Sequence, residues 1–258
     1  MPTRDHAPSG APCWTDLWTS DVDGSRRFYA EAFGWEAQEP NPEFGGYFMF
    51  TRDGVPVAGA MGDMGDMRAS NSWKIYFETS DIAVTLKKLE ECGGEVRAPA
   101  SPVADLGIQA VMTDRTGAEL GAWQPGAFPG FTVIEEPSSP SWFEYYATDH
   151  AAALTFYQSV FGWETDVVSD TDEFRYSTMR NPEGGGELAG LADGRSMLNG
   201  ATAHWSIYWA VEDVAASVAK VESLGGSLEM GPNDTPYGVL ASVADPAGAR
   251  FNLRRPPS

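Results

Sequence analysis

Apolar and polar residues alternate along the chain with two different periods. Apolar side chains at helical spacing predict amphipathic helices over 24–33 and 82–92, and glycine stands at the end of each, as is common at helix C-termini. Short aromatic or alternating runs predict strands over 47–51, 55–60, 108–112 and 119–123. With a short aromatic strand before each helix, each half of the chain follows the order of a strand, a helix and several strands, and then the same again, which we interpret as β-α-β-β-β written twice.

The whole pattern then returns in the second half of the chain. The aromatic segment 14–35 recurs as 142–163, which is 128 residues later. The short motif 114–117 recurs as 245–248 with an offset of 131. An offset that drifts by so few residues indicates tandem duplication of one fold with small loop insertions.

The duplication divides the chain into four parts. We expect a flexible N-terminus over 1–11, module one over 12–124, a linker over 125–139 and module two over 140–258. Prolines at 125, 129, 137 and 140 mark the linker and its end, and proline is disfavoured in a central strand.

Composition narrows the class of protein. Apolar residues make up 42% of the chain, which is enough for two sizeable cores. Acidic residues outnumber basic ones by 37 to 17, for a net charge of −20, so nucleic acid is excluded as a partner. The sequence has no apolar run long enough for a membrane span and no apolar signal core, so we expect a cytoplasmic protein without membrane contact. The two cysteines do not recur between the modules, which excludes a duplicated disulfide or metal framework.

A family resemblance follows from the recurrent motifs. Asp21 stands seven residues before Phe28-Tyr29, Phe33-Gly34-Trp35 follows, and Asp114-x-x-Gly117 closes the module, with all of these repeated in module two. This order resembles the vicinal oxygen chelate superfamily of glyoxalases, bleomycin-resistance proteins and extradiol dioxygenases, in particular its tandem members named as hydroxylases or glyoxalase-like proteins. The resemblance implies an α+β fold of two glyoxalase-like modules. Each would pair two β-α-β-β-β units in an open curved sheet, or cup, with helices outside and a small-molecule ligand on the concave side.

The same resemblance assigns six positions to the metal ligands of metal-dependent relatives. Here these positions hold Trp14, Lys74, Gly121, Trp142, Ser206 and Asn252. A divalent catalytic site needs about three nitrogen or oxygen donors that converge on one point, and none of the six is a His or Glu. We therefore expect no metal and no cofactor.

Strand alternation predicts which residues line the cups, because every second side chain shares a face. A lining of aromatic rings around a few charges suits a flat, partly polar ligand, for which stacking provides affinity and hydrogen bonds fix orientation. The predicted lining residues are Trp14, Asp16, Trp18, Lys74, Tyr76, Glu119 and Trp123 in module one, and Trp142, Glu144, Tyr146, Tyr208, Arg250, Asn252 and Arg254 in module two.

Two carboxylates are the candidate catalytic residues. We expect Asp16 to face Lys74, and Glu144 to face Arg250 or Arg254. A carboxylate among aromatic rings has its pKa raised by desolvation and could act as a general base. Alternatively, each carboxylate forms an internal ion pair that satisfies the charge left in the cup.

Three functions follow from these alternatives. The first is a metal-free binding protein of the bleomycin-resistance type that sequesters or carries a small, aromatic metabolite. The second is an enzyme of secondary metabolism or detoxification, with Asp16 or Glu144 as base for hydration, isomerisation or lyase-type cleavage. The third, a metal-dependent glyoxalase or dioxygenase, requires ligands that the sequence lacks.

The methionine-containing segment 62–68 either closes over the ligand or packs as a connector. Two modules in one chain favour a monomer over a homodimer.

Overall fold

The computed structural model describes residues 4–64, 70–184, 186–196, 198, 200 and 202–257. Both halves follow the predicted order of a strand, a helix and three strands, twice over. The first half contains β1 (Pro12–Trp18), α1 (Val22–Phe33), β2 (Glu36–Ala37), β3 (Phe48–Arg52), β4 (Val55–Met61), β5 (Ser72–Glu78), α2 (Ile82–Glu91), β6 (Glu95–Val103), β7 (Gly107–Thr113) and β8 (Glu119–Pro125). The second contains β9 (Pro140–Ala147), α3 (His150–Phe161), β10 (Glu164–Asp170), β11 (Arg175–Arg180), β12 (Glu187–Asp193), β13 (His204–Ala210), α4 (Val214–Ser223), β14 (Ser227–Thr235), β15 (Gly238–Ala244) and β16 (Arg250–Arg255). Short 3₁₀ turns cover Pro42–Phe44 and Gly194–Ser196.

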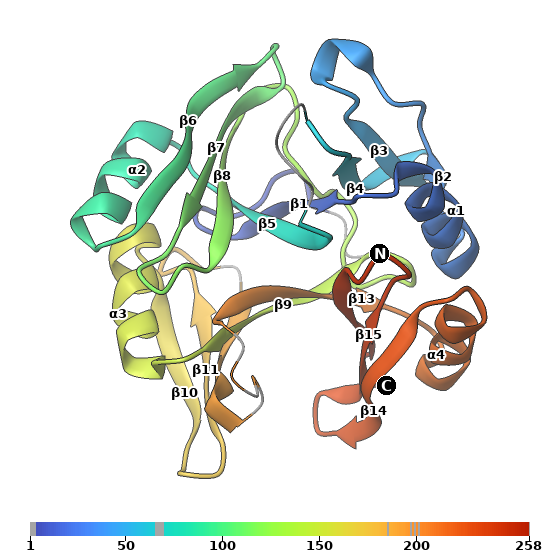
Figure 1. Ribbon diagram of the computed structural model, residues 1–258. Helices are drawn as coiled ribbons and strands as arrows, with labels where there is room; N and C mark the ends of the chain where they lie inside the picture. Colours follow the sequence, from blue (N-terminus) through green and yellow to red (C-terminus); the bar gives the residue numbers. More distant parts are fainter. Residues whose placement is uncertain are drawn as a thin grey trace.

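Each half folds into its own curved sheet of eight strands. The strand order is β2-β3-β4-β1-β5-β8-β7-β6 in the first sheet and β10-β11-β12-β9-β13-β16-β15-β14 in the second. No strand is exchanged between these two sheets, so each cup forms within one module. Figure 1 shows the two sheets opening in opposite directions, with β1 and β5 facing β9 and β13 at the centre. We call the concave side of the first sheet cup one and that of the second sheet cup two.

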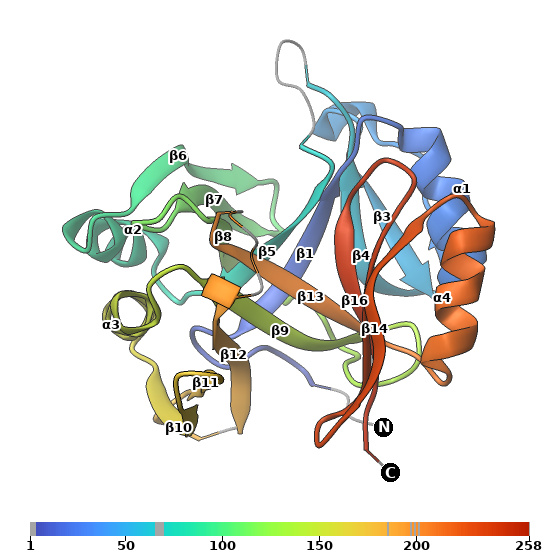
Figure 2. The same cartoon turned by 60° about the horizontal axis from the view of Figure 1, so that its bottom comes forward.

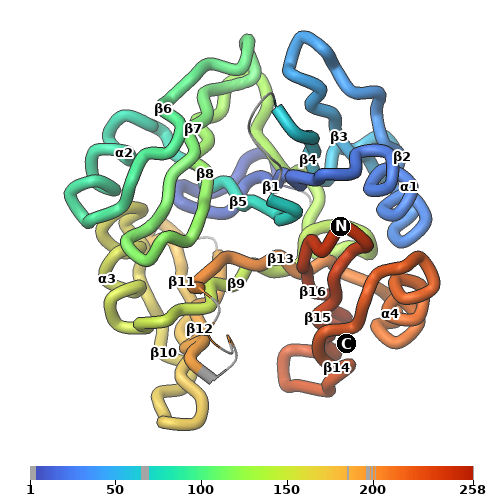
Figure 3. Tube along the Cα trace, viewed as in Figure 1, coloured from blue at the N-terminus to red at the C-terminus, as the bar shows by residue number. Residues whose placement is uncertain are grey.

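The helices cover the outer sides of the sheets. Figure 2 shows α1 beside α4 and α2 beside α3, so each neighbouring helix pair combines one helix from each module. The backbone trace in Figure 3 passes through the first cup completely before it enters the second. Among the described residues, no helix is long and apolar enough to cross a membrane.

The recurrent aspartates before the helices are N-caps. Asp21 Oδ1 accepts a hydrogen bond from the Gly24 amide at 2.9 Å, and Asp149 makes the same bond in module two. A carboxylate at this position satisfies an amide that the helix leaves unpaired and interacts favourably with the helix dipole. Gly34 ends α1 in the left-handed conformation, with φ of 71°, which glycine adopts without steric cost.

The segments before β1 and between the sheets contact both modules. Arg4 donates to the Phe131 carbonyl at 3.1 Å, and the Gly10 carbonyl accepts from Trp163 Nε1 at 3.0 Å. Phe131 is fully buried, and its amide bonds to the Cys13 carbonyl at 2.8 Å. Mobility of residues 1–11 stays a prediction, which limited proteolysis would test.

Reciprocal hydrogen bonds join the two modules. Tyr29 of α1 donates to Asp245 Oδ2 in the turn before β16 at 3.0 Å, and Tyr157 of α3 donates to Asp114 Oδ2 in the turn before β8 at 3.0 Å. The tyrosines and aspartates all belong to the repeated motifs. Each aspartate also binds its own turn, since Asp114 Oδ1 accepts from the amide of Ala118 at 3.0 Å. Asp114 and Asp245 therefore each bind a nearby amide through one oxygen and a tyrosine of the other module through the second.

Aromatic rings fill the space around these bonds. Trp73 and Trp209, from β5 and β13, lie 5.3 Å apart between ring centres, and Phe77 lies 4.8 Å from Trp205. These side chains project from the convex faces, so the two modules share one core while the cups face outward. Rings in such edge-on and tilted contacts contribute about 0.5–1.5 kcal/mol per pair beyond the area that they bury.

We predict that Tyr157→Phe lowers the free energy of unfolding by about 2 kcal/mol, because it removes a buried hydrogen bond to a charged group. The substitution also leaves Trp205 Nε1, which donates to the Tyr157 hydroxyl at 2.8 Å, without its acceptor. Urea denaturation followed by circular dichroism measures the change. Tyr237→Phe, at a side chain that is 45% exposed, is the control. Equal effects of the two substitutions would contradict the role of the inter-module bond.

Candidate functional site

A cavity of about 980 Å³ occupies cup one. Strands from both halves of the first sheet provide its walls, and the 3₁₀ turn at Pro42–Phe44 lies at its rim. All seven residues that strand alternation predicts for this cup lie around the cavity: Trp14, Asp16, Trp18, Lys74, Tyr76, Glu119 and Trp123. Phe44, Phe48 and Phe128 add three further rings. Their functional roles stay predictions.

Asp16 is the central buried carboxylate of the cavity wall. Its side chain is 4% exposed, and Oδ1 accepts hydrogen bonds from Trp14 Nε1 at 2.9 Å and from the Tyr47 hydroxyl at 2.7 Å. Desolvation raises the pKa of Asp16, and the hydrogen bonds from Tyr47 and Tyr76 partly offset that rise because they stabilise the anion.

Gly59 makes room for this arrangement on the neighbouring strand β4. A β-carbon at position 59 would lie 1.8 Å from the Tyr47 hydroxyl oxygen and 2.3 Å from Asp16 Oδ1. Gly190 stands in the same relation to Tyr176 in module two, at 1.9 Å from the hydroxyl oxygen. Any side chain at either position would separate the tyrosine from its carboxylate.

Lys74 provides the positive charge in cup one. It lies opposite Asp16 across the pairing of β1 with β5, as expected, and only 5% of its side chain is exposed. The ammonium lies 4.2 Å from the centre of the Trp18 ring and 3.8 Å from Glu119 Oε2. Desolvation lowers the pKa of Lys74, while Glu119 and Asp16 act in the opposite direction.

Glu144, the corresponding carboxylate of module two, lies in a cage of tyrosines. Tyr176 donates to Oε2 at 2.9 Å and Tyr208 to Oε1 at 3.0 Å, while the Tyr146 hydroxyl lies 2.9 Å from that of Tyr208. Trp142 Nε1 donates to Tyr176 at 3.1 Å, which repeats the contact of Trp14 with Tyr47. Burial raises the pKa of Glu144, and the hydrogen bonds from Tyr146, Tyr176 and Tyr208 oppose that rise.

The expected pairing of Glu144 with Arg250 or Arg254 is wrong. Arg250 pairs instead with Glu229 at 3.2 Å, and Arg254 donates to the Ser141 carbonyl at 3.2 Å. β16 is separated from β9 by β13, so two interstrand spacings, about 10 Å, lie between their backbones. Asn252 lies on β16 with its amide donating to Ser206 Oγ at 2.8 Å.

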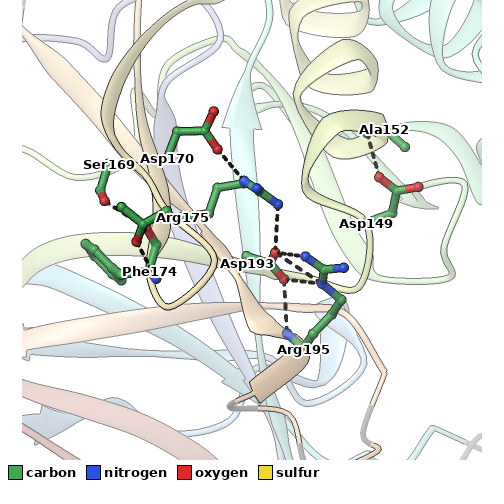
Figure 4. Close-up of polar contacts among 9 residues, drawn as sticks. Asp149, Ala152, Ser169, Asp170, Phe174, Arg175, Asp193 and Arg195 are labelled. Atoms are coloured by element: carbon green, nitrogen blue, oxygen red, sulfur yellow. Dashed lines mark hydrogen bonds and ion pairs between the residues drawn. The ribbon is translucent and has the colours of Figure 1, made fainter.

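A smaller hollow of about 560 Å³ lies on the convex side of module two, between α3 and the strands β10 and β11. Figure 4 shows its two arginines bonded to Asp170 and Asp193, while Asp149 accepts from the Ala152 amide. Arg175 Nε donates to Asp170 at 2.5 Å, and Arg195 Nε donates to Asp193 at 2.9 Å. The arginines of this hollow thus have carboxylate partners at close range.

Residues 65–68 of the methionine-containing segment 62–68 lie outside the described residues. Met61 and Met64 are described, and both line the cavity of cup one.

Comparison with known proteins identifies the family. A model described as the Glyoxalase/Bleomycin resistance protein/Dioxygenase superfamily matches residues 139–253, and a model of a glyoxalase-like domain matches residues 14–122. CFP32 of Mycobacterium tuberculosis (strain CDC 1551 / Oshkosh), which has a provisional glyoxylase name, is 32% identical over 99% of this chain and 98% of its own. The chain belongs to the glyoxalase/bleomycin resistance/dioxygenase superfamily.

Other known proteins resemble the chain over most of its length. DnrV of Streptomyces peucetius, named as an anthracycline biosynthesis protein, is 34% identical over 95% of this chain and 92% of its own. A Mn(II)-bound glyoxalase from Novosphingobium aromaticivorans has a TM-score of 0.62 at 15% identity, covering 95% of this chain and 82% of the other. For the 2,2',3-trihydroxybiphenyl 1,2-dioxygenase of Sphingomonas wittichii strain RW1 the TM-score is 0.64 at 15% identity, covering 96% and 91%. At that identity the two structures show the fold alone.

The donor set in the two cups does not fit the divalent metal of such superfamily members. Lys74 places an ammonium at one of the expected ligand positions of cup one, and Asn252 uses its amide for Ser206 in cup two. Within the described ranges, no three His, Cys, Asp or Glu side chains are grouped so that they could hold a metal ion. A cation would meet one buried carboxylate per cup, and in each case tyrosine and tryptophan donors already bond to it.

The sequence interpretation missed Tyr47 and Tyr176, the hydroxyl donors to the two carboxylates. Tyr47 lies just before β3, and Tyr176 lies on β11. Neither belongs to the strands used for the parity argument. The sequence repeat could have identified them, because Tyr47 and Gly59 in module one correspond to Tyr176 and Gly190 in module two.

We predict that Glu144→Gln gains stability relative to the wild type as the pH rises. The raised pKa of Glu144 means that the folded protein binds this proton more tightly than the unfolded chain does, so its contribution is complete below about 4.5, the ordinary pKa, and is lost as pH rises toward the raised value. The free energy of unfolding of the wild type should therefore fall relative to the variant, by about 1.4 kcal/mol per pH unit in that window. Urea titrations between pH 4 and pH 8 measure the difference. Glu187→Gln, at an exposed carboxylate of the same module, is the control; if both variants show the same pH dependence, Glu144 does not bind its proton in this way.

Proposed function

We propose that the protein binds a flat aromatic metabolite in cup one without a metal ion, for sequestration or carriage. The observation that supports this most directly is the cavity of about 980 Å³, whose aromatic walls surround one buried lysine and one buried aspartate. Drug-sized ligands occupy pockets of about 300–1,000 Å³, so the volume suits a ligand of several rings rather than a small aldehyde.

The aromatic lining favours a planar ligand. Phe128, after β8, contacts Trp14 and Trp123 at ring distances of 4.8 and 6.2 Å, and Phe44 and Phe48 add two further rings to the lining. Stacking on such rings provides affinity, while the few polar groups at the centre fix orientation. The relationship to DnrV supports the same ligand class, because that relative is named for the biosynthesis of anthracyclines.

We predict that filling the cup abolishes binding. Val111 lines the cavity from β7, and Val111→Trp places an indole where the ligand would lie. A panel of planar anthraquinones, titrated with tryptophan fluorescence as readout, should bind the wild type with micromolar affinity and the variant at least tenfold more weakly. Val84→Trp, at a half-exposed position on α2, adds the same fluorophore outside the cup and should bind as the wild type does. Unchanged binding by the Val111 variant would place the ligand elsewhere.

A second function, acid–base catalysis, is favoured by the raised pKa of Asp16. A carboxylate with a raised pKa is a stronger base and could remove a proton from a bound ligand. Asp16→Asn separates the two functions, because the amide oxygen can still accept from Trp14 and Tyr47. For a binding protein we expect the dissociation constant to change less than about threefold. For an enzyme with Asp16 as base, turnover should fall by about 100-fold or more while binding persists, whereas turnover that survives the substitution would exclude Asp16 as the base.

A further inference from the structure

Lys74 is a buried cation without a close acceptor. Its nearest carboxylate oxygen, Glu119 Oε2 at 3.8 Å, lies beyond normal hydrogen-bond distance. Among the described residues, the ammonium donates no hydrogen bond within 3.5 Å, and Glu119 is its only ion-pair partner. Charged groups that are removed from water need hydrogen-bonded partners, and an ammonium carries three donors.

A second donor beside it has the same need. Trp18 lines the cavity below the Lys74 ammonium, and its indole Nε1 is buried with no hydrogen-bond partner among the described residues. Buried polar groups in folded proteins nearly always find a partner. A buried ammonium whose carboxylate partner lies at 3.8 Å, beside an indole N–H without a partner, favours a ligand that brings acceptors to this wall of the cavity.

The charged and titratable groups named below, all within the described part of the chain, have partners, are buried or face solvent. Asp16 on β1 accepts from Trp14 and Tyr47. Glu119 on β8 is 50% exposed, and Tyr76 on β5 is buried. At the rim, Glu39 pairs with Arg26 at 2.6 Å, Arg97 pairs with Glu95 at 3.1 Å, and Glu43 is exposed.

The hollow of module two provides a contrast within the same chain. Its two arginines, drawn in Figure 4, have carboxylates at 2.5 and 2.9 Å, although both are more exposed than Lys74. The cations there are balanced inside the protein. Lys74 is the more buried cation and lacks such a partner.

We propose that the ligand of cup one carries an acidic hydroxyl group conjugated with a ring carbonyl and binds as its anion, with its oxygens directed at Lys74 Nζ and Trp18 Nε1. The inference rests on the proposed function and names the ligand class for the same cavity. A planar ligand that fills the cup removes the remaining water from the ammonium, and an anionic oxygen compensates for that loss. The hydroxyl proton passes to the solvent on binding. Burial lowers the pKa of Lys74, and the ligand anion would counteract that effect.

The test compares two probes that differ by one methyl group. 1,2-Dihydroxyanthraquinone has an acidic hydroxyl whose ionisation changes its visible spectrum, whereas 1-hydroxy-2-methoxyanthraquinone cannot ionise at that oxygen. Both are titrated into the full-length protein at a pH where the free dihydroxy probe is protonated. We expect the bound dihydroxy probe to show the phenolate spectrum and to bind about tenfold or more tightly than its methyl ether.

Variants of two lysines complete the test. Lys74→Met should remove the phenolate spectrum and make the affinities of the two probes equal. Lys88→Met, which removes the same charge from the exposed surface of α2, should leave both properties unchanged. The spectrum of the wild-type complex is a readout that does not depend on the folding of any variant.

Each outcome decides the inference. Equal affinities of the wild type for the two probes, or a phenolate spectrum that persists in Lys74→Met, would overturn the ligand class and leave the proposed binding function intact. If neither probe binds the wild type, and the wider anthraquinone panel does not bind either, the proposed function fails and the inference fails with it.

Discussion

The reciprocal hydrogen bonds from Tyr29 to Asp245 and from Tyr157 to Asp114 are the constraint on which the rest of the structure depends. Each bond joins a helix of one module to a turn of the other, so the two convex faces meet in one aromatic core. The concave faces are thereby directed away from each other, as Figure 1 shows. This arrangement explains why the most strongly repeated motifs of the chain contribute to the interface rather than to the cups. The repeated motifs stabilise the fold, whereas residues that differ between the modules give each cup its own chemistry.

The two cups preserve one arrangement and differ around it. In both, a strand carboxylate accepts from a tyrosine that also accepts from tryptophan, and a glycine on the neighbouring strand makes room for the pair. Cup one adds Lys74, for which cup two has Ser206. In cup two, three tyrosines surround Glu144, and Phe174 and Tyr237 contact one of these, Tyr176, at ring distances of 5.7 and 6.4 Å. The carboxylate, tyrosine and glycine thus belong to the shared architecture, and the buried cation gives cup one its own chemistry.

Much of this could be predicted from the sequence, because the relevant signals are local. Strand alternation placed Trp14, Asp16 and Lys74 around one cavity, and the aspartates before the helices were recognisable from their spacing. The position of Tyr47 was not predictable in this way, since it reaches Asp16 from beyond the adjacent strand β4. Strand alternation predicts the face of the sheet on which a side chain lies. It does not predict which strand is adjacent. The predicted pairing of Glu144 with Arg250 was wrong for that reason. β13 lies between their strands, and Arg250, whose long side chain lies near a strand end, pairs with Glu229 instead. The inter-module bonds of Asp114 were likewise hidden, because a turn motif accounts for only one of its two oxygens.

The central claim is that cup one holds a planar aromatic ligand at a lysine rather than at a metal ion. A crystal structure of the protein with a bound hydroxyanthraquinone, grown with manganese and measured at a wavelength where manganese scatters anomalously, tests this most directly. The account predicts ligand density between the aromatic walls of cup one, with an oxygen within hydrogen-bond distance of Lys74 Nζ and no anomalous peak in the cavity. A manganese ion bound between Asp16 and the ligand, or a ligand bound in cup two alone, would contradict it.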